Sequence, residues 1–191
     1  MRVVGLTGGV GSGKSKVLKL LKADYHADII QADEVAKELQ EPGQAAFEQL
    51  VEALGTGILD TAGRIDRRVL AGLIFDRPDI RETVNGIVHP LAWERIRQLV
   101  RASEADLIVI EAALLDQITT EIYDELWYVY TAKELRIQRL ARTRGYSRER
   151  TLAMMAAQAD DEEFCRAADW VIDNNGTIND LKKQLETRLK R

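Results

Sequence analysis

A glycine-rich loop near the start of the chain carries the residue types that phosphate binding requires. Gly8, four further residues and then Gly13-Lys14-Ser15 match the P-loop pattern, between a strand-like run and a helical pattern. Glycines let the backbone turn its N–H groups toward one anion, and the helix N-terminus adds partial positive charge. Lys14 can reach the β- and γ-phosphates of ATP, and the Ser15 hydroxyl suits Mg²⁺. The alternative, a glycine-rich turn that binds nothing, leaves the complete motif unexplained.

This loop defines most of the predicted nucleotide contacts. They are Gly9, Val10, Gly11, Ser12, Gly13, Lys14, Ser15 and Lys16, and Ser15 is also the predicted magnesium ligand. The sequence lacks the Asn-Lys-x-Asp element with which small GTPases bind guanine. A kinase is therefore favoured over a small GTPase.

Two carboxylates follow predicted strands. Asp33 comes after the run 27–31, and Glu111 ends the run that starts at Leu107. Ligands of α/β proteins bind at the carboxyl ends of parallel strands, so both side chains can approach the phosphate site. Asp33 can accept the proton of a substrate hydroxyl, or it can simply cap the following helix. Glu111 can approach the metal, or it can pair with an arginine.

Four arginines share the predicted helix 133–144: Arg136, Arg139, Arg142 and Arg144. Most arginines on a helix are solvated, but a kinase needs positive charge over the transferring phosphoryl group. Each helical residue turns the chain by ~100°, so Arg142 lies about 60° from Arg139 and Arg144 about 140° away. If Arg139 faces the phosphates, Arg142 is therefore its expected partner, and Gly145 is expected to end the helix.

Short apolar runs alternate with helical patterns along the chain. The strand-like runs are 3–7, 27–31, 107–110, 126–130 and 170–173, and the helical patterns are 34–54, 66–75, 79–101, 133–144, 147–163 and 178–190. This order predicts an α/β fold, with a three-layer P-loop core around a mainly parallel five-stranded sheet.

Two helical stretches predict additions to this core. Residues 34–101 form a helical insertion beside the carboxyl ends of the strands, and residues 133–163 form a small lid. The core then comprises 1–33, 102–132 and 164–191. The alternative is that both stretches are ordinary packing helices.

Composition narrows the functional classes. A length of 191 residues with 46% hydrophobic content supports one substantial core, and a net charge of −4 argues against a protein that coats nucleic acid. Cys165 is the only cysteine, so no intramolecular disulfide can form. No apolar run reaches the ~20 residues of a membrane span. We therefore expect a cytoplasmic protein with no membrane or nucleic-acid partner.

The ordered motifs resemble the dephospho-CoA kinase family along nearly the whole chain. They are residues 5–15, Gln31-Ala32-Asp33, Gly63-Arg64-Ile65-Asp66-Arg67 with Leu70 and Phe75, His89-Pro90, residues 111–116, Gln138-Arg139-Leu140, Ala157-Gln158 and residues 168–176. The resemblance implies ATP-dependent phosphorylation of the ribose 3′-hydroxyl of dephospho-CoA, with Mg²⁺ as cofactor. It also implies that the insertion helps hold dephospho-CoA and that the arginine-bearing stretch is the lid.

Carried over position by position, the resemblance assigns residue roles. Asp33 is the base, and Lys14 and Arg139 complete the catalytic set. The family's second lid arginine falls at Thr143, so Arg142 joins the predicted ATP contacts on helix geometry instead. Asn174 and Gly176 fall where the family approaches adenine. The implied substrate contacts are Asp33, Arg67, His89 and Glu111. For His89 the alternative is a turn or helix-start histidine that bonds locally, and we expect Trp93 and Phe75 to lie in the core rather than to stack on a base.

Several positions depart from the family pattern: Gln31 replaces an acid, Glu111 an Asp, Ala113 a Pro, and Thr143-Arg144 an Arg-Asp pair. Two other functions stay open on the residues alone. One is a P-loop kinase for another small acceptor, such as a nucleoside monophosphate. The other is a nucleotide-binding regulator without catalysis, against which Lys14, Ser15 and Asp33 argue.

Overall fold

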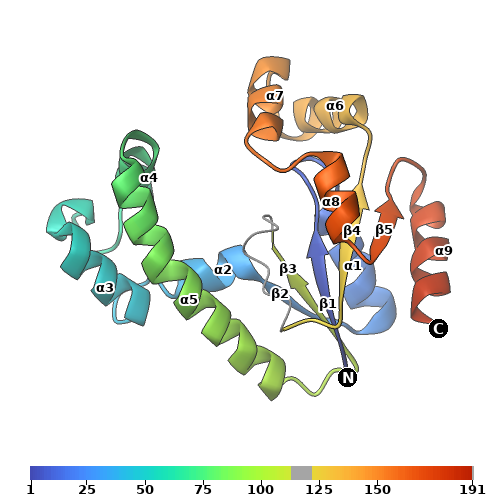
Figure 1. The fold of residues 1–191 in the computed structure, drawn as a ribbon, viewed down its shortest axis with the longest axis horizontal. Helices are drawn as coiled ribbons and strands as arrows, with labels where there is room; N and C mark the ends of the chain where they lie inside the picture. The colour runs from blue at the N-terminus through green and yellow to red at the C-terminus, as the bar shows by residue number, and fades with distance from the viewer. Residues whose placement is uncertain (113–121, 191) are drawn as a thin grey trace. The chain divides into compact units, whose positions relative to one another are not determined.

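The computed structural model describes residues 1–112 and 122–190 (Figure 1). The elements, in chain order, are β1 (Arg2–Thr7), α1 (Lys14–Tyr25), β2 (Asp28–Gln31), α2 (Ala32–Glu38), α3 (Ala45–Leu54), the 3₁₀ turn η1 (Thr56–Ile58), α4 (Arg67–Asp76), α5 (Pro78–Ala102), β3 (Leu107–Glu111), β4 (Glu125–Tyr130), α6 (Lys133–Arg144), α7 (Arg148–Ala156), α8 (Asp161–Ala167), β5 (Trp170–Asp173) and α9 (Ile178–Leu189). The motif position Ala113 lies outside the described residues.

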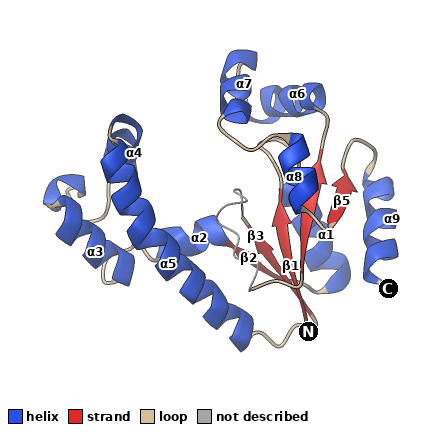
Figure 2. Cartoon of the chain, viewed as in Figure 1, coloured by secondary structure: helices blue, strands red, loops and turns tan. Residues whose placement is uncertain are grey.

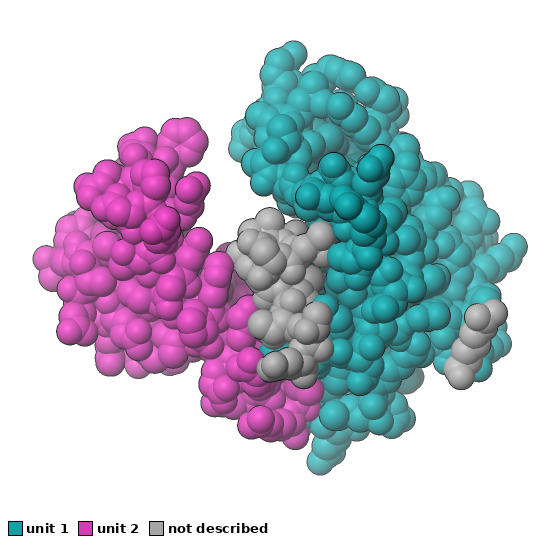
Figure 3. Space-filling view, viewed as in Figure 1, with its two compact units in different colours: residues 1–30, 103–191 teal, residues 31–102 magenta. Residues whose placement is uncertain are grey.

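The chain divides into two compact units, residues 1–30 with 103–191, and residues 31–102 (Figure 3). Each unit has its own apolar cluster of buried side chains. The division into core, insertion and lid that the sequence predicts stays a prediction.

The strands form a single five-stranded sheet in the order β2-β3-β1-β4-β5 (Figure 2). The pairings of β1 with β3, of β1 with β4 and of β4 with β5 are all parallel. In register, Leu6 pairs with Glu111 and Thr7 with Tyr128, so these strands end at one edge. The predicted parallel α/β sheet is confirmed.

Helices cover both faces of the sheet. On one face, alternate strand residues such as Val4, Val109 and Val129 are fully buried against α1 and α9. On the other face, Phe164 of α8 stacks on Tyr128 of β4, with ring centroids 4.9 Å apart. This burial on both faces explains the continuous apolar runs of the strands and confirms the three-layer core.

The unit 31–102 is helical. Its core gathers apolar side chains of α3, η1, α4 and α5, and its buried members are Ala46, Leu50, Ile58, Ile65, Leu70, Val84 and Val88. Asp66 begins α4 as its N-cap, because its carboxylate accepts hydrogen bonds from the amides of Arg68 and Val69. In the described parts of the chain, no helix is both long and apolar enough to cross a membrane.

Two predicted helices are wrong in extent. The pattern 34–54 is split into α2 and α3, because Glu41-Pro42-Gly43 interrupts it and Gly43 adopts a φ of 81°. The pattern 147–163 is split into α7 and α8, where Asp160 and Glu163 form a capping box that starts a new helix. The sequence carries a signal at each break, Pro42-Gly43 at the first and the acidic run 160–163 at the second.

The two aromatic side chains that we expected in the core differ. Trp93 is buried at 9% exposure, but Phe75 is 89% exposed, so its assignment to the core is wrong. Helix α4 turns Phe75 about 140° away from the buried Leu70, which places it on the opposite side of the helix.

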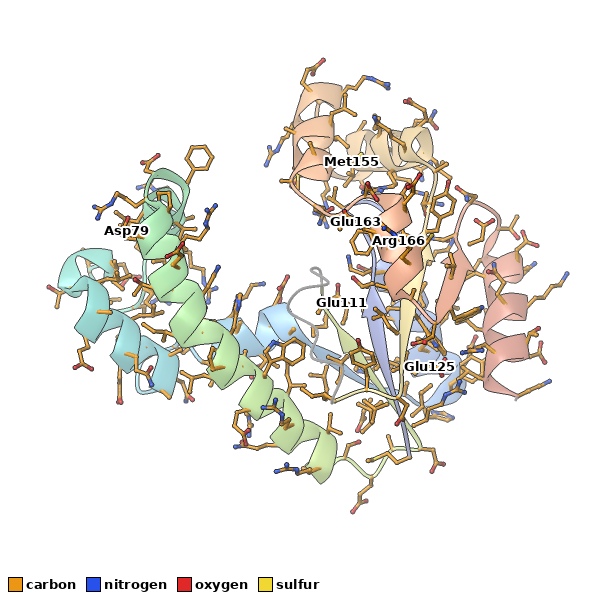
Figure 4. All side chains as sticks on the ribbon, in the orientation of Figure 1. Asp79, Glu111, Glu125, Met155, Glu163 and Arg166 are labelled. Atoms are coloured by element: carbon orange, nitrogen blue, oxygen red, sulfur yellow. The ribbon has the colours of Figure 1, made fainter. Side chains whose placement is uncertain are left out.

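One buried carboxylate ties the start of β4 to two other elements. Glu125 (Figure 4) pairs with Arg2 of β1 and Arg188 of α9, and its side chain is 9% exposed. Burial acts to raise the pKa of Glu125, but hydrogen bonds from Trp127, Arg188 and Arg2, together with the charge of Arg2, outweigh it and lower that pKa. The ion pairs are therefore formed at neutral pH.

We predict that Glu125→Gln lowers the free energy of unfolding by about 1–3 kcal/mol at neutral pH, because two arginines lose their counter-charge. A depressed folded-state pKa gives stability above the unfolded pKa that is lost as the pH falls through the folded pKa. The difference between mutant and wild type in urea unfolding should thus shrink as the pH falls below the usual pKa of a glutamate and through the lowered pKa of Glu125. Glu186→Gln, which removes an exposed pair with Lys190, should change little. An undiminished difference in acid would contradict the account.

Candidate active site

The P-loop joins β1 to α1 and has the backbone that its glycines allow. Gly11 and Gly13 adopt φ values of 76° and 94°, which side-chain-bearing residues rarely adopt, and Gly13 is the N-cap of α1. Ser15 lies in the first turn of α1 with its side chain exposed. The helix N-terminus and the loop thus have the backbone geometry of an anion site, and phosphate binding there stays a prediction.

Lys14 brings its charge to the carboxyl edge of the sheet. Its Nζ donates to the carbonyl of Gly8 at 2.6 Å and lies 3.6 Å from Oε1 of Glu111, the last residue of β3 (Figure 4). The two side chains are only 15% and 12% exposed. The structure therefore brings the predicted residues Lys14 and Glu111 together beside the loop.

The carbonyl of Ser12 is held by side chains from three other segments. It accepts hydrogen bonds from Thr131 Oγ1 at 2.8 Å, from Asn174 Nδ2 at 2.7 Å and from Arg139 Nη1 at 3.5 Å. A loop that turns its N–H groups toward an anion turns carbonyls away from it, and these need donors inside the protein. The residues after β4 and β5 supply them.

Three of the predicted ATP contacts use their amides within the protein. The amide of Val10 donates to Gln158 Oε1 at 2.8 Å, that of Ser12 to the carbonyl of Gly9 at 3.1 Å, and that of Lys16 to the carbonyl of Gly13 at 2.9 Å. A phosphate contact through these amides stays a prediction, and it would need these bonds to be shared.

Helix α6 places its arginines in different surroundings. Arg139 donates from Nη2 to the carbonyl of Asn174 at 2.8 Å and from Nη1 to Thr131 Oγ1 at 3.2 Å. Burial lowers the pKa of Arg139, and the nearby charge of Arg142 lowers it further. Arg144 instead lies over the ring of Tyr146, at 6.0 Å. Helix α6 ends with Gly145 as its C-cap, which confirms the predicted end. The choice of Arg142 rather than Arg144 as the partner of Arg139 stays a prediction.

Asp33, Arg67 and His89 belong to the unit 31–102. The N-cap of α2 is Gln31, and Asp33 is an exposed residue of the first helical turn, so the alternative that Asp33 caps this helix is wrong. Arg67 is the first residue of α4 and pairs with Glu41 at 3.3 Å. As substrate contacts, Asp33 and Arg67 stay predictions.

His89 lies in the interior of α5, so its assignment to a turn or helix start is wrong. The helix continues through Pro90, which removes one backbone hydrogen bond. Val88, Ala92 and Trp93, on either side of the proline, are buried, and their packing stabilises the helix across that position. A contact of His89 with substrate stays a prediction.

The turn after β5 packs against the loop. The side chain of Asn174 is 1% exposed, and Asn175 Oδ1 accepts the amide of Ala132 at 2.8 Å. Gly176 has no room for a side chain, because Oδ2 of Asp180 lies 2.8 Å from the position of a Cβ. The predicted adenine contacts of Asn174 and Gly176 stay predictions.

The donor set fits a magnesium ion that arrives with ATP. Within residues 1–112 and 122–190, no group of three or more His, Cys, Asp or Glu side chains could form a protein cage for a metal. The exposed Ser15 hydroxyl and the Glu111 carboxylate are hard oxygen donors. Mg²⁺ favours this arrangement, since it takes few protein ligands and completes its shell with phosphates and water.

Three functional candidates were missed or only partly recognised from the sequence. Thr131 directly follows β4, Arg136 is 6% exposed on α6, and Gln158 appeared only as part of a motif. The signal for Arg136 was its place on α6 beside the apolar positions Ile137 and Leu140, which are also buried. A charged residue on a buried face implies a partner.

A strand, a phosphate loop with its lysine and a parallel sheet together define the core of a P-loop kinase. A solved structure from Thermus thermophilus is similar, with a TM-score of 0.83 and 30% identity over 99% of this chain and 96% of that chain. Two further solved structures share the fold. Dephospho-CoA kinase from Campylobacter jejuni has a TM-score of 0.70 and 21% identity over 100% of this chain and 96% of that chain. Shikimate kinase from Acinetobacter baumannii has a TM-score of 0.56 and 14% identity over 100% of this chain and 94% of that chain.

Sequence comparison gives the family. The family model described as dephospho-CoA kinase matches residues 2–180. The dephospho-CoA kinase of Carboxydothermus hydrogenoformans is 36% identical over 99% of this chain and 93% of its own length. That of Streptomyces avermitilis is 38% identical over 97% of this chain and 91% of its own length. The chain belongs to the dephospho-CoA kinase family. It is an ATP-dependent kinase that phosphorylates a hydroxyl of dephospho-CoA.

We predict that Lys14→Ala folds but loses transfer by roughly 10²-fold or more, because Lys14 supplies charge to the transferring phosphoryl group. Turnover and thermal unfolding without nucleotide measure the two effects separately. Lys19→Ala, at an exposed position of the same helix, is the control and should keep both. A steep fall in melting temperature for Lys14→Ala would instead show a structural lysine.

We predict that Arg142→Ala lowers turnover by at least about tenfold and that Arg144→Ala changes it much less, because only Arg142 lies beside Arg139. Arg139→Ala should also lower the melting temperature, since the carbonyl of Asn174 loses a donor. Steady-state kinetics and melting curves of the three variants test this. A larger loss for Arg144→Ala than for Arg142→Ala would remove Arg142 from the site.

Proposed function

We propose how the residues of this chain carry out the phosphorylation of dephospho-CoA. The observation that carries the proposal is the position of Lys14 Nζ, between the carbonyl of Gly8 and the carboxylate of Glu111. In this proposal, the loop amides near Gly11, Gly13 and the start of α1 bind the phosphates of ATP. Lys14 then leaves the Gly8 carbonyl and follows the charge of the γ-phosphate.

Ser15 and Glu111 are the residues that would hold Mg²⁺, Ser15 directly and Glu111 at the edge of the sheet. When bound, the ion would offset the negative charge of the phosphates. Glu111 already lies within 3.6 Å of Lys14, so both charges of the site would be next to the phosphates.

Asp33 is the proposed base. Its exposed carboxylate would accept the proton of the ribose 3′-hydroxyl as that oxygen forms its bond to the γ-phosphorus. The bond from this phosphorus to the β,γ-bridging oxygen breaks, and ADP leaves. Arg139 and Arg142 would stabilise the charge that develops on the transferring group.

The remaining roles are proposed for whole segments and without reacting atoms. Residues 34–101, with Arg67 and His89, would hold the CoA precursor, and residues 133–163 would be the lid over the core formed by 1–33, 102–132 and 164–191. Asn174 and Gly176 would lie near adenine. The cytoplasmic location and the absence of nucleic-acid and membrane partners stay predictions. Family membership favours dephospho-CoA over a nucleoside monophosphate and over a role without catalysis.

The test of the acceptor is a coupled assay of ADP release with Mg²⁺ and ATP. ADP should appear with dephospho-CoA, and only at background rate with nucleoside monophosphates or without an acceptor. The product should carry phosphate at the 3′ position. Faster turnover of a nucleoside monophosphate would overturn the proposal.

We predict that Asp33→Asn keeps ATP binding and lowers turnover by roughly 10²–10⁴-fold, because the amide cannot take the proton. Binding of ATP by calorimetry and turnover with saturating dephospho-CoA give the two quantities. Glu34→Gln is the matched control, since it neutralises the next exposed carboxylate of the same helical turn. Near-normal turnover of Asp33→Asn would leave Asp33 with a structural role only.

A further inference from the structure

Val10, on the outer turn of the P-loop, is held through both of its backbone groups by side chains of one distant region. Its amide donates to Gln158 Oε1 at 2.8 Å, and its carbonyl accepts from Arg136 Nε at 2.8 Å. Arg136 lies on α6, and Gln158 follows α7. Two contacts on one residue fix its peptide planes more firmly than either contact alone.

The guanidinium of Arg136 is itself fixed. Its side chain is 7% exposed, and Nη1 lies 3.3 Å from Oδ1 of Asp161. The same carboxylate oxygen accepts the hydroxyl of Tyr128 at 2.6 Å, and Tyr128 is fully buried in β4. Arg136 therefore links the P-loop to the sheet through Asp161, and its position does not depend on solvent-exposed contacts alone.

This guanidinium occupies the space that a side chain at position 9 would need. A Cβ on Gly9 would lie 2.8 Å from Cζ and 3.1 Å from Nη1 of Arg136. Gly9 is not among the glycines with positive φ, so its backbone conformation does not itself require glycine. The close approach of Arg136 supplies the reason for glycine at this position.

Such a clamp has a direct consequence for nucleotide binding. A phosphate loop that is ordered before ATP arrives does not lose its conformational freedom on binding, so more of the interaction energy appears as affinity. Val10 lies immediately before Gly11, which adopts a φ of 76°. A shift of Val10 would change the direction of the amides that follow.

We propose that Arg136 and Gln158 are positioning residues for ATP, which hold the P-loop in its phosphate-binding shape at Val10 and make glycine necessary at position 9. The inference concerns the ATP site alone. It rests on the proposed role of the loop amides but not on the identity of the acceptor. The start of the predicted lid is thereby attached to the loop that it would cover.

The test measures ATP binding without any acceptor, by calorimetry with Mg²⁺ and ATP, and then the KM values for both substrates. Arg136→Ala and Gln158→Ala should each weaken ATP binding by about five- to tenfold and raise the KM for ATP. The KM for dephospho-CoA should stay unchanged. Arg136→Lys should not restore affinity, because an ammonium cannot reach both Val10 and Asp161 in the geometry of the guanidinium. Arg144→Ala, which removes the same charge from the same helix, is the control.

A double-mutant cycle tests the coupling between positions 9 and 136. Gly9→Ala should weaken ATP binding by about tenfold or more in the wild type and much less when Arg136 is already alanine. Additive effects would overturn the proposal, as would unchanged ATP affinity in both Arg136→Ala and Gln158→Ala. If Arg136→Ala fails to fold, Gln158→Ala decides alone, because Gln158 is only half-buried. Normal ATP binding without transfer to dephospho-CoA would count against the proposed function and not against the clamp.

Discussion

The carbonyls of the P-loop impose the constraint on which the rest of this unit depends. A loop that gathers N–H groups around an anion turns its carbonyls into the protein, where each needs a donor. Here the carbonyl of Ser12 is met by Thr131 and Asn174, and that of Val10 by Arg136. These donors come from the ends of β4 and β5 and from α6, so the loop depends on the sheet order, in which β4 pairs with β1 and β5 follows on the far side of β4.

The surroundings of the arginines on α6 follow from the same need for donors to the loop carbonyls. Arg136 is buried and Arg139 is half-buried, and both turn toward the loop, whereas Arg142 is exposed. The first two satisfy backbone carbonyls, and Arg136 also pairs with Asp161. A helix whose arginines were all solvated would carry charge but would not fix the loop. The arginines that hold the loop and those proposed to act on the phosphates therefore lie on one short helix.

Much of the fold could be predicted because its signals are local. The apolar runs gave the strands, and Gly145 gave the end of α6. Predictions failed where a local sequence pattern is compatible with two different structures. Pro42-Gly43 and the acidic run 160–163 can lie inside a helical stretch or end a helix, and here a helix ends at each. His89-Pro90 instead reads as a boundary, although tertiary packing carries α5 through it. Phe75 shows that hydrophobicity alone does not decide which side of a helix is buried.

By itself, the sequence determined the phosphate loop, the lysine and hydroxyl beside it, the order of strands and helices and, through its ordered motifs, the resemblance to dephospho-CoA kinases. These features are contiguous in the chain, and short-range chemistry fixes them. Only the tertiary structure decided which side chains hold the loop. Gln158 lies 148 positions from Val10, and Asn174 162 positions from Ser12. Such hydrogen bonds arise from strand order and helix packing over the sheet, because a donor and acceptor so far apart in the chain meet only when the whole unit has folded.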